Sequence, residues 1–175
     1  MFKLREIERK DVKAINNWRN DAELIACLGA PFRFVSEAVD EAWYDNYMKV
    51  RNSTIRLSIV KEENEDKILG LISLVNINYI NGTAELHIMI GDKDNRGKGM
   101  GTFAVKSVIE HAFMNMNLRR IELLVLEENA AAIALYKKCG FVEEGVKRLS
   151  HLKCGKYVNT VMMALLKEDY LKGTI

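Results

Sequence analysis

The fold of this chain is decided by residues 88–104, which read IMIGDKDNRGKGMGTFA. An apolar strand pattern runs into a charged turn, a helical pattern follows, and three glycines alternate with other residues between them: Gly97, Gly99 and Gly101. Glycine lacks a side chain and adopts positive φ, so backbone N–H groups can converge on one point. A helix that begins there adds unpaired N–H groups and the positive end of its dipole. With Arg96 and Lys98 alongside, the stretch predicts a cradle for a phosphate or pyrophosphate group.

Three phosphate-binding motifs compete for this stretch. A P-loop requires G-x-x-x-x-G-K-[ST], and it is absent because Gly97-Lys98 is followed by Gly99. A dinucleotide fingerprint, G-x-G-x-x-A, is formally present from Gly99 to Ala104, but that motif should open directly from its strand and here a turn intervenes. The third motif, R-x-x-G-x-G, begins at Arg96 and fits without exception. A glycine-rich turn that binds nothing is the remaining alternative.

The composition describes an ordinary globular protein. The chain has 175 residues, of which 49% are hydrophobic and 29% charged, and this suits one domain over residues 1–175 with a sizeable core. A net charge of +2 gives no argument for nucleic acid as a partner. No apolar run reaches membrane-spanning length, no secretory signal is visible and no metal-ligand spacing occurs. The cysteines are widely spaced and indicate free thiols in a reducing compartment, the cytoplasm: Cys27, Cys139 and Cys154.

Apolar periodicity predicts an alternating order of strands and helices. Alternating patterns mark the strands, with a hairpin signal at Asn81-Gly82 between the third and the fourth: residues 2–7, 55–59, 68–77, 84–90, 119–126, 141–151 and 157–166. Helical spacing marks the helices, with Asp11 and Ser36 opening the first two and Gly140 ending the last: residues 11–25, 36–50, 100–116 and 129–139. This order predicts an α/β fold, a mixed sheet with helices on both faces.

A second motif lies at residues 129–141, which read NAAAIALYKKCGF. It matches N-x-x-A-x-x-x-Y-x-x-x-G-F, and together with the preceding R-x-x-G-x-G it resembles the GNAT N-acetyltransferases. The resemblance covers nearly the whole chain. It is greatest to the branch that holds spermidine N-acetyltransferases, ribosomal-protein N-terminal acetyltransferases and aminosugar acetyltransferases. It implies the GNAT fold, a mixed, mostly antiparallel six- to seven-stranded sheet with helices on both faces and a splayed central strand pair.

The resemblance also implies an activity. The chain would be an acetyl-CoA-dependent N-acetyltransferase that moves the acetyl group to a primary amine of a small molecule, a polyamine such as spermidine or an aminosugar. The amine would attack directly, without an acyl-enzyme. A protein N-terminal acetyltransferase of the ribosomal type and a non-catalytic CoA-binding module stay open as alternatives. The family further implies a homodimer or a larger homo-oligomer.

The residues that would hold acetyl-CoA follow from the two motifs. The backbone of the strand before the loop would bind the pantetheine amides, and a main-chain N–H of Met89 or Ile90 would polarise the thioester carbonyl. Asn129 would bond the cofactor arm, although it could equally be a plain helix N-cap. The full expected set is Ile88, Met89, Ile90, Arg96, Gly97, Lys98, Gly99, Met100, Gly101, Thr102, Asn129 and Ala132.

Acyl transfer also needs an acid and a base. The resemblance assigns the acid to Tyr136, whose reference pKa of about 10 is close enough to that of an alkyl thiol for it to return a proton to departing CoA. Without the family this tyrosine would be an ordinary core aromatic. Glu85 is the first candidate for the base, and His87, on the same face of the strand, is the second. A solvated or ion-paired strand residue is the alternative for both.

The acceptor pocket is expected between the first two helices and the last hairpin. Acidic residues of the second helix could attract a polycation, or could simply form a solvated helix face: Glu37, Asp40, Glu41 and Asp45. Spermidine enzymes carry an acidic pair just before a proline in this region. Here residues 28–31 read LGAP and contain no acid, which keeps the aminosugar alternative open.

Overall fold

The computed structural model describes residues 1–92, 94 and 97–173. Within these residues one sheet of seven strands runs in the order β1-β2-β3-β4-β5-β7-β6. Every described pair in it is antiparallel except β4 and β5, which are parallel. The strands are β1 Phe2–Glu6, β2 Ile55–Lys61, β3 Asn64–Asn78, β4 Thr83–Ile90, β5 Arg120–Leu126, β6 Val142–Lys153 and β7 Lys156–Leu166. The expected sheet is confirmed.

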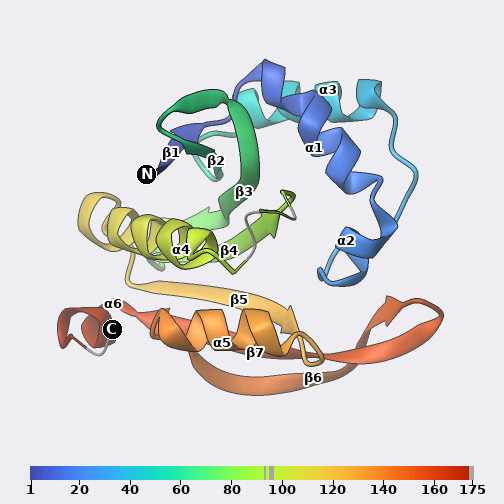
Figure 1. Cartoon of the computed structure of the whole chain (residues 1–175). Helices are drawn as coiled ribbons and strands as arrows, with labels where there is room; N and C mark the ends of the chain where they lie inside the picture. Colours follow the sequence, from blue (N-terminus) through green and yellow to red (C-terminus); the bar gives the residue numbers. More distant parts are fainter. Residues whose placement is uncertain (93, 95–96, 174–175) are drawn as a thin grey trace.

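Helices cover the two faces of this sheet unequally (Figure 1). Their bounds are η1 Arg9–Asp11, α1 Val12–Arg19, α2 Ala22–Ala26, α3 Glu37–Lys49, α4 Met100–Glu110, η3 His111–Asn115, α5 Ala130–Lys138 and α6 Lys167–Leu171. The main core lies between the sheet and the α4 and α5 side, where Ala104, Val108 and Phe113 are fully buried. A smaller core lies on the opposite face, where Ile15 of α1 and Tyr47 of α3 pack on β2 and β3.

The first predicted helix is wrong in its length. The structure breaks residues 11–25 into α1 and α2 at Asn20, because the Asp21 carboxylate accepts from the Leu24 N–H at 3.1 Å and starts a new helix. Asp11 does not cap α1 with its side chain. Its buried carboxylate instead pairs with the Arg5 guanidinium at 2.7 Å and accepts from Ser58 Oγ at 2.8 Å. A helical period alone cannot locate such a break, since both helices contribute buried apolar residues at helical spacing.

The remaining elements agree with the sequence to within a few residues. Ser36 is the N-cap residue of α3, and Gly140 follows α5 with φ 89°. The predicted long helix after the glycines ends in a π-helical turn, residues 111–115, and the short C-terminal helix α6 was not expected. The Asn81-Gly82 hairpin is confirmed, with Gly82 at φ 65°.

The centre of the sheet contains a fork. β4 and β5 pair only at their first residues, from Thr83 with Arg120 to Glu85 with Glu122. Beyond Glu85, β4 pairs on its other edge with β3, and β5 pairs with β7. The two strands therefore separate along Leu86–Ile90, as the expected splayed pair requires. The fork opens toward the loop that leads into α4.

Candidate active site

The backbone of β4 presents amides to the fork. The Gly91 N–H donates to the Leu69 carbonyl at 3.1 Å, while Ile90 stands opposite Gly70 in the β3–β4 register. In an antiparallel ladder this makes the Ile90 pair a non-hydrogen-bonded one, so the amides of Ile90 and Ile88 are directed away from β3. The Met89 amide is directed at β3. Of the two expected oxyanion donors, the geometry therefore favours Ile90 over Met89.

The glycine loop is an open cradle at the end of the fork. Gly97 has φ 75° and Gly99 has φ 82°, a conformation that side chains rarely adopt. A Cβ atom built at either position would meet nothing within 4 Å. Gly99 is the left-handed N-cap residue of α4, so the first N–H groups of that helix face the same space. Lys98 beside them is exposed, and the expected partner Arg96 lies outside the described residues.

Two further glycines are required by packing rather than by backbone conformation. A Cβ atom on Gly91 would lie 1.9 Å from the Trp18 ring, so α1 rests directly on the start of the loop. A Cβ atom on Gly101 would lie 2.6 Å from Leu135 Cδ1, so α4 and α5 meet closely at the cradle. Met100, between the cradle glycines, is buried in the main core, and Thr102 is half-buried in the first turn of α4. The loop is thus held from both faces of the sheet.

Tyr136 projects from α5 into the main core. It is 7% exposed, and its ring packs edge-on against Phe141 with centroids 5.8 Å apart. Burial, and secondarily the neighbouring Cys139 thiol, raises the pKa of the Tyr136 phenol to about 12. The phenol is therefore protonated throughout the physiological range, as a proton donor must be. The same burial fits the alternative of an ordinary core aromatic equally well.

The two candidate bases contact one another. Glu85 Oε1 lies 2.8 Å from His87 Nε2, and Asn76 Nδ2 donates to Glu85 Oε2 at 3.1 Å. Glu85 and His87 share the face of β4 opposite to the main core, because the alternate residues Leu86 and Ile88 pack in that core. Sequence reasoning missed Asn76 because its contact depends on a register shift in β3.

A small cavity lies beside Glu85. Its volume is about 140 Å³, and charged side chains of β5 and β6 line it together with leucines and methionines. Arg120 pairs there with Glu122 at 3.2 Å and with Glu144 at 2.5 Å. Glu85, Glu122 and Glu144 thus bring three carboxylates to one cavity at the base of the fork, against the cations Arg120 and Lys147.

Asn129 is the N-cap residue of α5. Its Oδ1 accepts from the Ala132 N–H at 3.1 Å, and its Nδ2 donates to the Cys27 carbonyl at 3.0 Å. Lys153 reaches the same region, donating from Nζ to the Ile25 carbonyl at 3.0 Å and to the Ala30 carbonyl at 2.5 Å. These bonds tie the end of α2 to α5 and to the β6–β7 hairpin, which Figure 1 shows close to α2. Lys153 carried no signal in the sequence.

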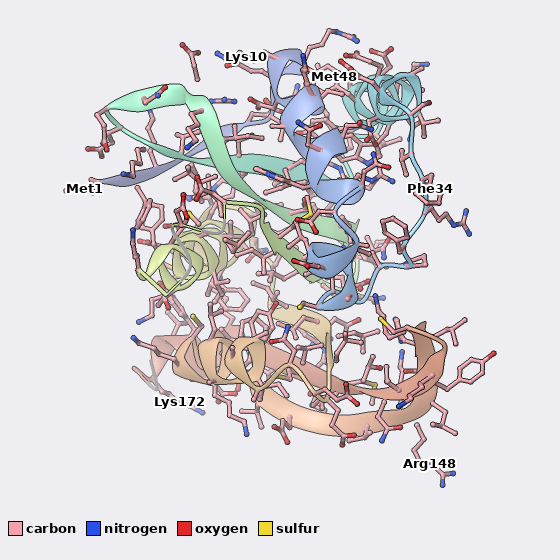
Figure 2. All side chains as sticks on the ribbon, turned by 45° about the vertical axis from the view of Figure 1, so that its right-hand side comes forward. Met1, Lys10, Phe34, Met48, Arg148 and Lys172 are labelled. Carbon is pink, nitrogen blue, oxygen red and sulfur yellow. The ribbon has the colours of Figure 1, made fainter. Side chains whose placement is uncertain are left out.

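The acidic residues of α3 are mostly paired within the chain. Asp40 is fully buried and binds the Arg19 guanidinium, and Asn16 Nδ2 donates to it at 2.7 Å. Glu41 and Asp45 both bind the Arg9 guanidinium, while Glu37 is exposed. Phe34, in the loop that leads to this helix, is 92% exposed and projects outward (Figure 2). The α3 surface therefore offers little uncompensated negative charge.

A larger cavity of about 510 Å³ lies between α1 and the start of β3, and Trp18 and Asp92 are among its lining residues. Its lysines are paired, Lys10 with Asp66 at 2.6 Å and Lys67 with Asp92 at 3.3 Å. Tyr136, Glu85 and His87 are not among the residues that line it. The candidate base Glu85 and the glycine cradle lie at the two ends of the fork instead, while Tyr136 is buried in the main core.

Two kinds of feature were not found in the part of the chain that the structure describes. No group of three or more His, Cys, Asp or Glu side chains there could hold a metal ion. None of the described helices has both the length and the apolar character needed to cross a membrane.

The class of protein is defined by two features: the parallel strands β4 and β5 separate in the middle of a mixed sheet, and the glycine cradle lies at the end of the fork between them. The Acetyltransferase (GNAT) domain matches residues 2–142, and the chain belongs to this family. It is 32% identical over 168 residues to the spermidine N(1)-acetyltransferase of Vibrio cholerae, covering 96% of this chain and 94% of that one.

Solved structures agree with this assignment. Spermidine N-acetyltransferase from Vibrio cholerae in complex with CoA and spermine has a TM-score of 0.90 and 30% identity, covering 97% of this chain and 98% of that one. A dodecameric structure of spermidine N-acetyltransferase from Vibrio cholerae in an intermediate state has a TM-score of 0.84 and 29% identity, covering 99% and 98%. The chain is therefore an acetyl-CoA-dependent N-acetyltransferase with the GNAT fold, as the two motifs indicated.

Proposed function

We propose that this enzyme transfers the acetyl group of acetyl-CoA to a primary amine of a polyamine by direct attack. The observation that carries the proposal is the fork, which ends at the open cradle of Gly97 and Gly99 and has carboxylates at its base. The similarity to spermidine acetyltransferases, one of them seen with CoA and spermine, supports the choice of acceptor.

The cofactor would lie along the fork. Backbone N–H groups of residues 97–102 and the positive end of the α4 dipole would hold the pyrophosphate, and a Cβ atom built on Gly97 or Gly99 meets no other described part of the chain within 4 Å. The amides of Ile88 and Ile90 would bind the pantetheine arm and the thioester oxygen, in the manner of an added strand. Asn129 would reach the arm through the second donor of Nδ2 or the second lone pair of Oδ1, because its bonds to Cys27 and Ala132 use one of each, and Ala132 lies beside it in the first turn of α5.

The chemistry needs a base for the amine and an acid for the thiolate. Either Glu85 or His87 would accept a proton from the attacking nitrogen as the new C–N bond forms. Tyr136 would donate its phenolic proton to sulfur as the C–S bond breaks, and solvent would restore both groups. Net products are the acetamide and the CoA thiol, with one proton released when the acceptor enters as an ammonium ion.

A cationic acceptor would find counter-charge at the base of the fork. Glu85, Glu122 and Glu144 line one small cavity there, although Arg120 pairs with two of them, as arginines also pair with most acids of α3. Carboxylates in a partly enclosed site attract an ammonium group more strongly than exposed ones do. The missing acidic pair at residues 28–31 therefore need not exclude a polyamine.

Two further parts of the proposal concern the state of the protein. We propose that the whole chain acts as one domain and self-associates, since a homologous acetyltransferase forms a dodecamer. The three free cysteines, two of them exposed, suit a reducing compartment such as the cytoplasm.

The proposal is tested by measuring CoA release from acetyl-CoA with spermidine, spermine, a nucleotide-linked aminosugar and an N-terminal peptide in parallel. Turnover of the polyamines well above the other acceptors is the expected result. Turnover of the aminosugar or the peptide alone would keep the mechanism and replace the acceptor. Binding of acetyl-CoA without turnover of any amine would leave the alternative of a CoA-binding module.

A further inference from the structure

The two candidate bases differ in their position relative to the fork. Glu85 occupies the last paired position of β4, opposite Glu122 of β5. His87 is the next residue on the same face, and at that level β5 has already separated from β4. His87 is therefore the first side chain on this face beyond the point where the fork opens. It is exposed, with 56% of its side chain accessible, whereas Glu85 is 27% accessible.

The contact between them decides which nitrogen of His87 carries a proton. A carboxylate can only accept hydrogen bonds, so a bond of 2.8 Å to Glu85 Oε1 requires a proton on Nε2. In the neutral ring this leaves Nδ1 as the proton acceptor. When Nδ1 takes a proton the ring becomes a cation, and the adjacent carboxylate stabilises it. The same division of labour between carboxylate and imidazole operates in Ser-His-Asp enzymes.

Asn76 in turn fixes the carboxylate. Its amide donates to Glu85 Oε2 at 3.1 Å, which leaves Oε1 directed at His87. Asn76 has φ 52° near the end of β3, at the register shift between Val75 and Asn78. A non-glycine residue in this conformation is strained, and such strain persists only where the surrounding structure maintains it. The shift places the Asn76 amide against Glu85.

We propose that Asn76, Glu85 and His87 form a relay in which His87 Nδ1 removes the proton from the acceptor amine, Glu85 holds the ring and Asn76 holds Glu85. This inference rests on the proposed function and names its base. In the reaction His87 takes the proton of the ammonium ion and passes it to solvent. The freed nitrogen attacks the acetyl carbon, and the C–S bond breaks as Tyr136 gives its proton to sulfur. The second nitrogen proton then passes to solvent, and solvent returns a proton to the Tyr136 phenolate.

Other charges surround the relay and set its field. Glu122 and Arg120 of β5 and Glu144 and Lys147 of β6 line the cavity next to Glu85. On the other side, Ser73 of β3 is the cross-strand partner of His87. Its Oγ accepts a hydrogen bond from Arg56 Nη1 of β2 at 3.3 Å. Arg120 and Arg56 remain cationic across the assay range, so they hold fixed positive charge beside the relay.

The test compares three variants by the pH profile of turnover at saturating acetyl-CoA and acceptor. His87→Gln keeps a donor for Glu85 but cannot take up a proton, so kcat should fall about 100-fold or more and its acidic limb should disappear. Asn76→Gly retains the positive φ and removes the amide, so kcat should fall roughly tenfold, with an altered acidic limb and an unchanged Kd for acetyl-CoA. The matched control is Asn117→Gly, also a positive-φ asparagine, at φ 54° in the turn before β5, which should behave as the wild type.

Two outcomes would overturn the relay. If His87→Gln kept the wild-type rate and acidic limb while Glu85→Gln lost both, the carboxylate would be the base. If Asn76→Gly lowered activity only in proportion to lost folded protein, Asn76 would be structural. A wild-type enzyme that acetylated no amine would instead contradict the proposed function, because the relay is tested only relative to wild-type turnover.

Discussion

The two halves of the sheet are covered differently, and the difference explains where the chemistry lies. Strands β1 to β4 have α1 and α3 on one face and α4 on the other, whereas β5, β7 and β6 have the nine-residue helix α5 on one face of the part that the structure describes (Figure 1). Strand β6 is exposed along most of its length. In the covered half Trp18 of α1 rests on Gly91 at the start of the glycine loop, while under the proposed function the uncovered half would leave one side of the fork open to the acceptor.

The largest effect is expected in the cradle of the covered half. Gly99→Val places a branched side chain in the space reserved for the pyrophosphate and strains a residue at φ 82°, so calorimetry should detect no binding of acetyl-CoA. The matched control is Gly155→Val in the β6–β7 turn, at φ 80° and also without neighbours within 4 Å. It should lose similar stability and still bind. Equal affinity in both variants would refute the cradle.

The next largest effect is expected on kcat, with no change in the affinity for acetyl-CoA. Tyr136→Phe removes only the phenolic hydroxyl, so kcat should fall by about 100-fold while the Kd for acetyl-CoA stays unchanged. Rapid-quench measurement of the acetylated product, together with calorimetry, separates the two quantities. An unchanged kcat would make Tyr136 the ordinary core aromatic that its burial also allows.

Stability should depend on alkaline pH through the same residue. The Tyr136 phenol has a pKa of about 12 in the folded protein, against a reference of about 10 in the unfolded chain. The folded state therefore holds this proton more tightly, and the stability it contributes is complete below pH ~10 and lost as the pH rises toward ~12. Urea unfolding should show the wild type losing up to ~1.4 kcal/mol more per pH unit than Tyr136→Phe in that window. If the free energies of unfolding of the two proteins changed in parallel with pH, the raised pKa of Tyr136 would be contradicted.

A further effect tests the contact that joins α1 to the loop. Gly91→Ala brings a methyl group into the Trp18 ring, so the free energy of unfolding should fall by about 1–3 kcal/mol or more. In a Trp18→Leu background the same substitution should cost much less, because the neighbour is gone. Additive losses in this double-mutant cycle would show that Trp18 does not pack on Gly91.

The smallest effect on stability is expected for Lys153 in the β6–β7 hairpin, in the uncovered half of the sheet. Lys153→Met removes the donor to the Ile25 and Ala30 carbonyls, so stability should fall by about 1 kcal/mol and the KM for the acceptor should rise, with acetyl-CoA binding unchanged. Lys156→Met, exposed at the start of β7 in the same hairpin, is the control and should change neither quantity. A rise in the Kd for acetyl-CoA instead would place Lys153 on the cofactor side.

The sequence anticipated elements with a local pattern better than contacts between distant segments. Alternating apolar residues located the strands, and Gly97, Gly99 and Gly140 each announced a backbone conformation that the structure contains. Contacts between distant segments carry no such periodicity. The bonds from Asn129 to Cys27 and from Lys153 to α2 join segments more than a hundred residues apart, and nothing local marks them. The break at Asp21 was missed because a capping aspartate looks like any other polar residue on a helix surface.

The candidate bases illustrate the same limit. Parity along the strand placed Glu85 and His87 on one face, which the structure bears out. The choice between them as the proposed base depends on the residue at which β5 separates from β4. That position is a property of tertiary packing, and no sequence pattern in β4 predicts it. The contact of Asn76 with Glu85 occurs at a register shift in β3, which the sequence of β4 cannot predict either.

The central claim is that the fork itself receives the cofactor, and amide hydrogen exchange along β4 tests it most directly. The Ile88 N–H is directed at the fork and the Met89 N–H at β3, so each amide is a control for the other. Saturating acetyl-CoA should slow exchange at Ile88 strongly and leave Met89, already bonded within the sheet, nearly unchanged. Exchange at Ile88 that stayed at its cofactor-free rate under saturating acetyl-CoA would contradict the account.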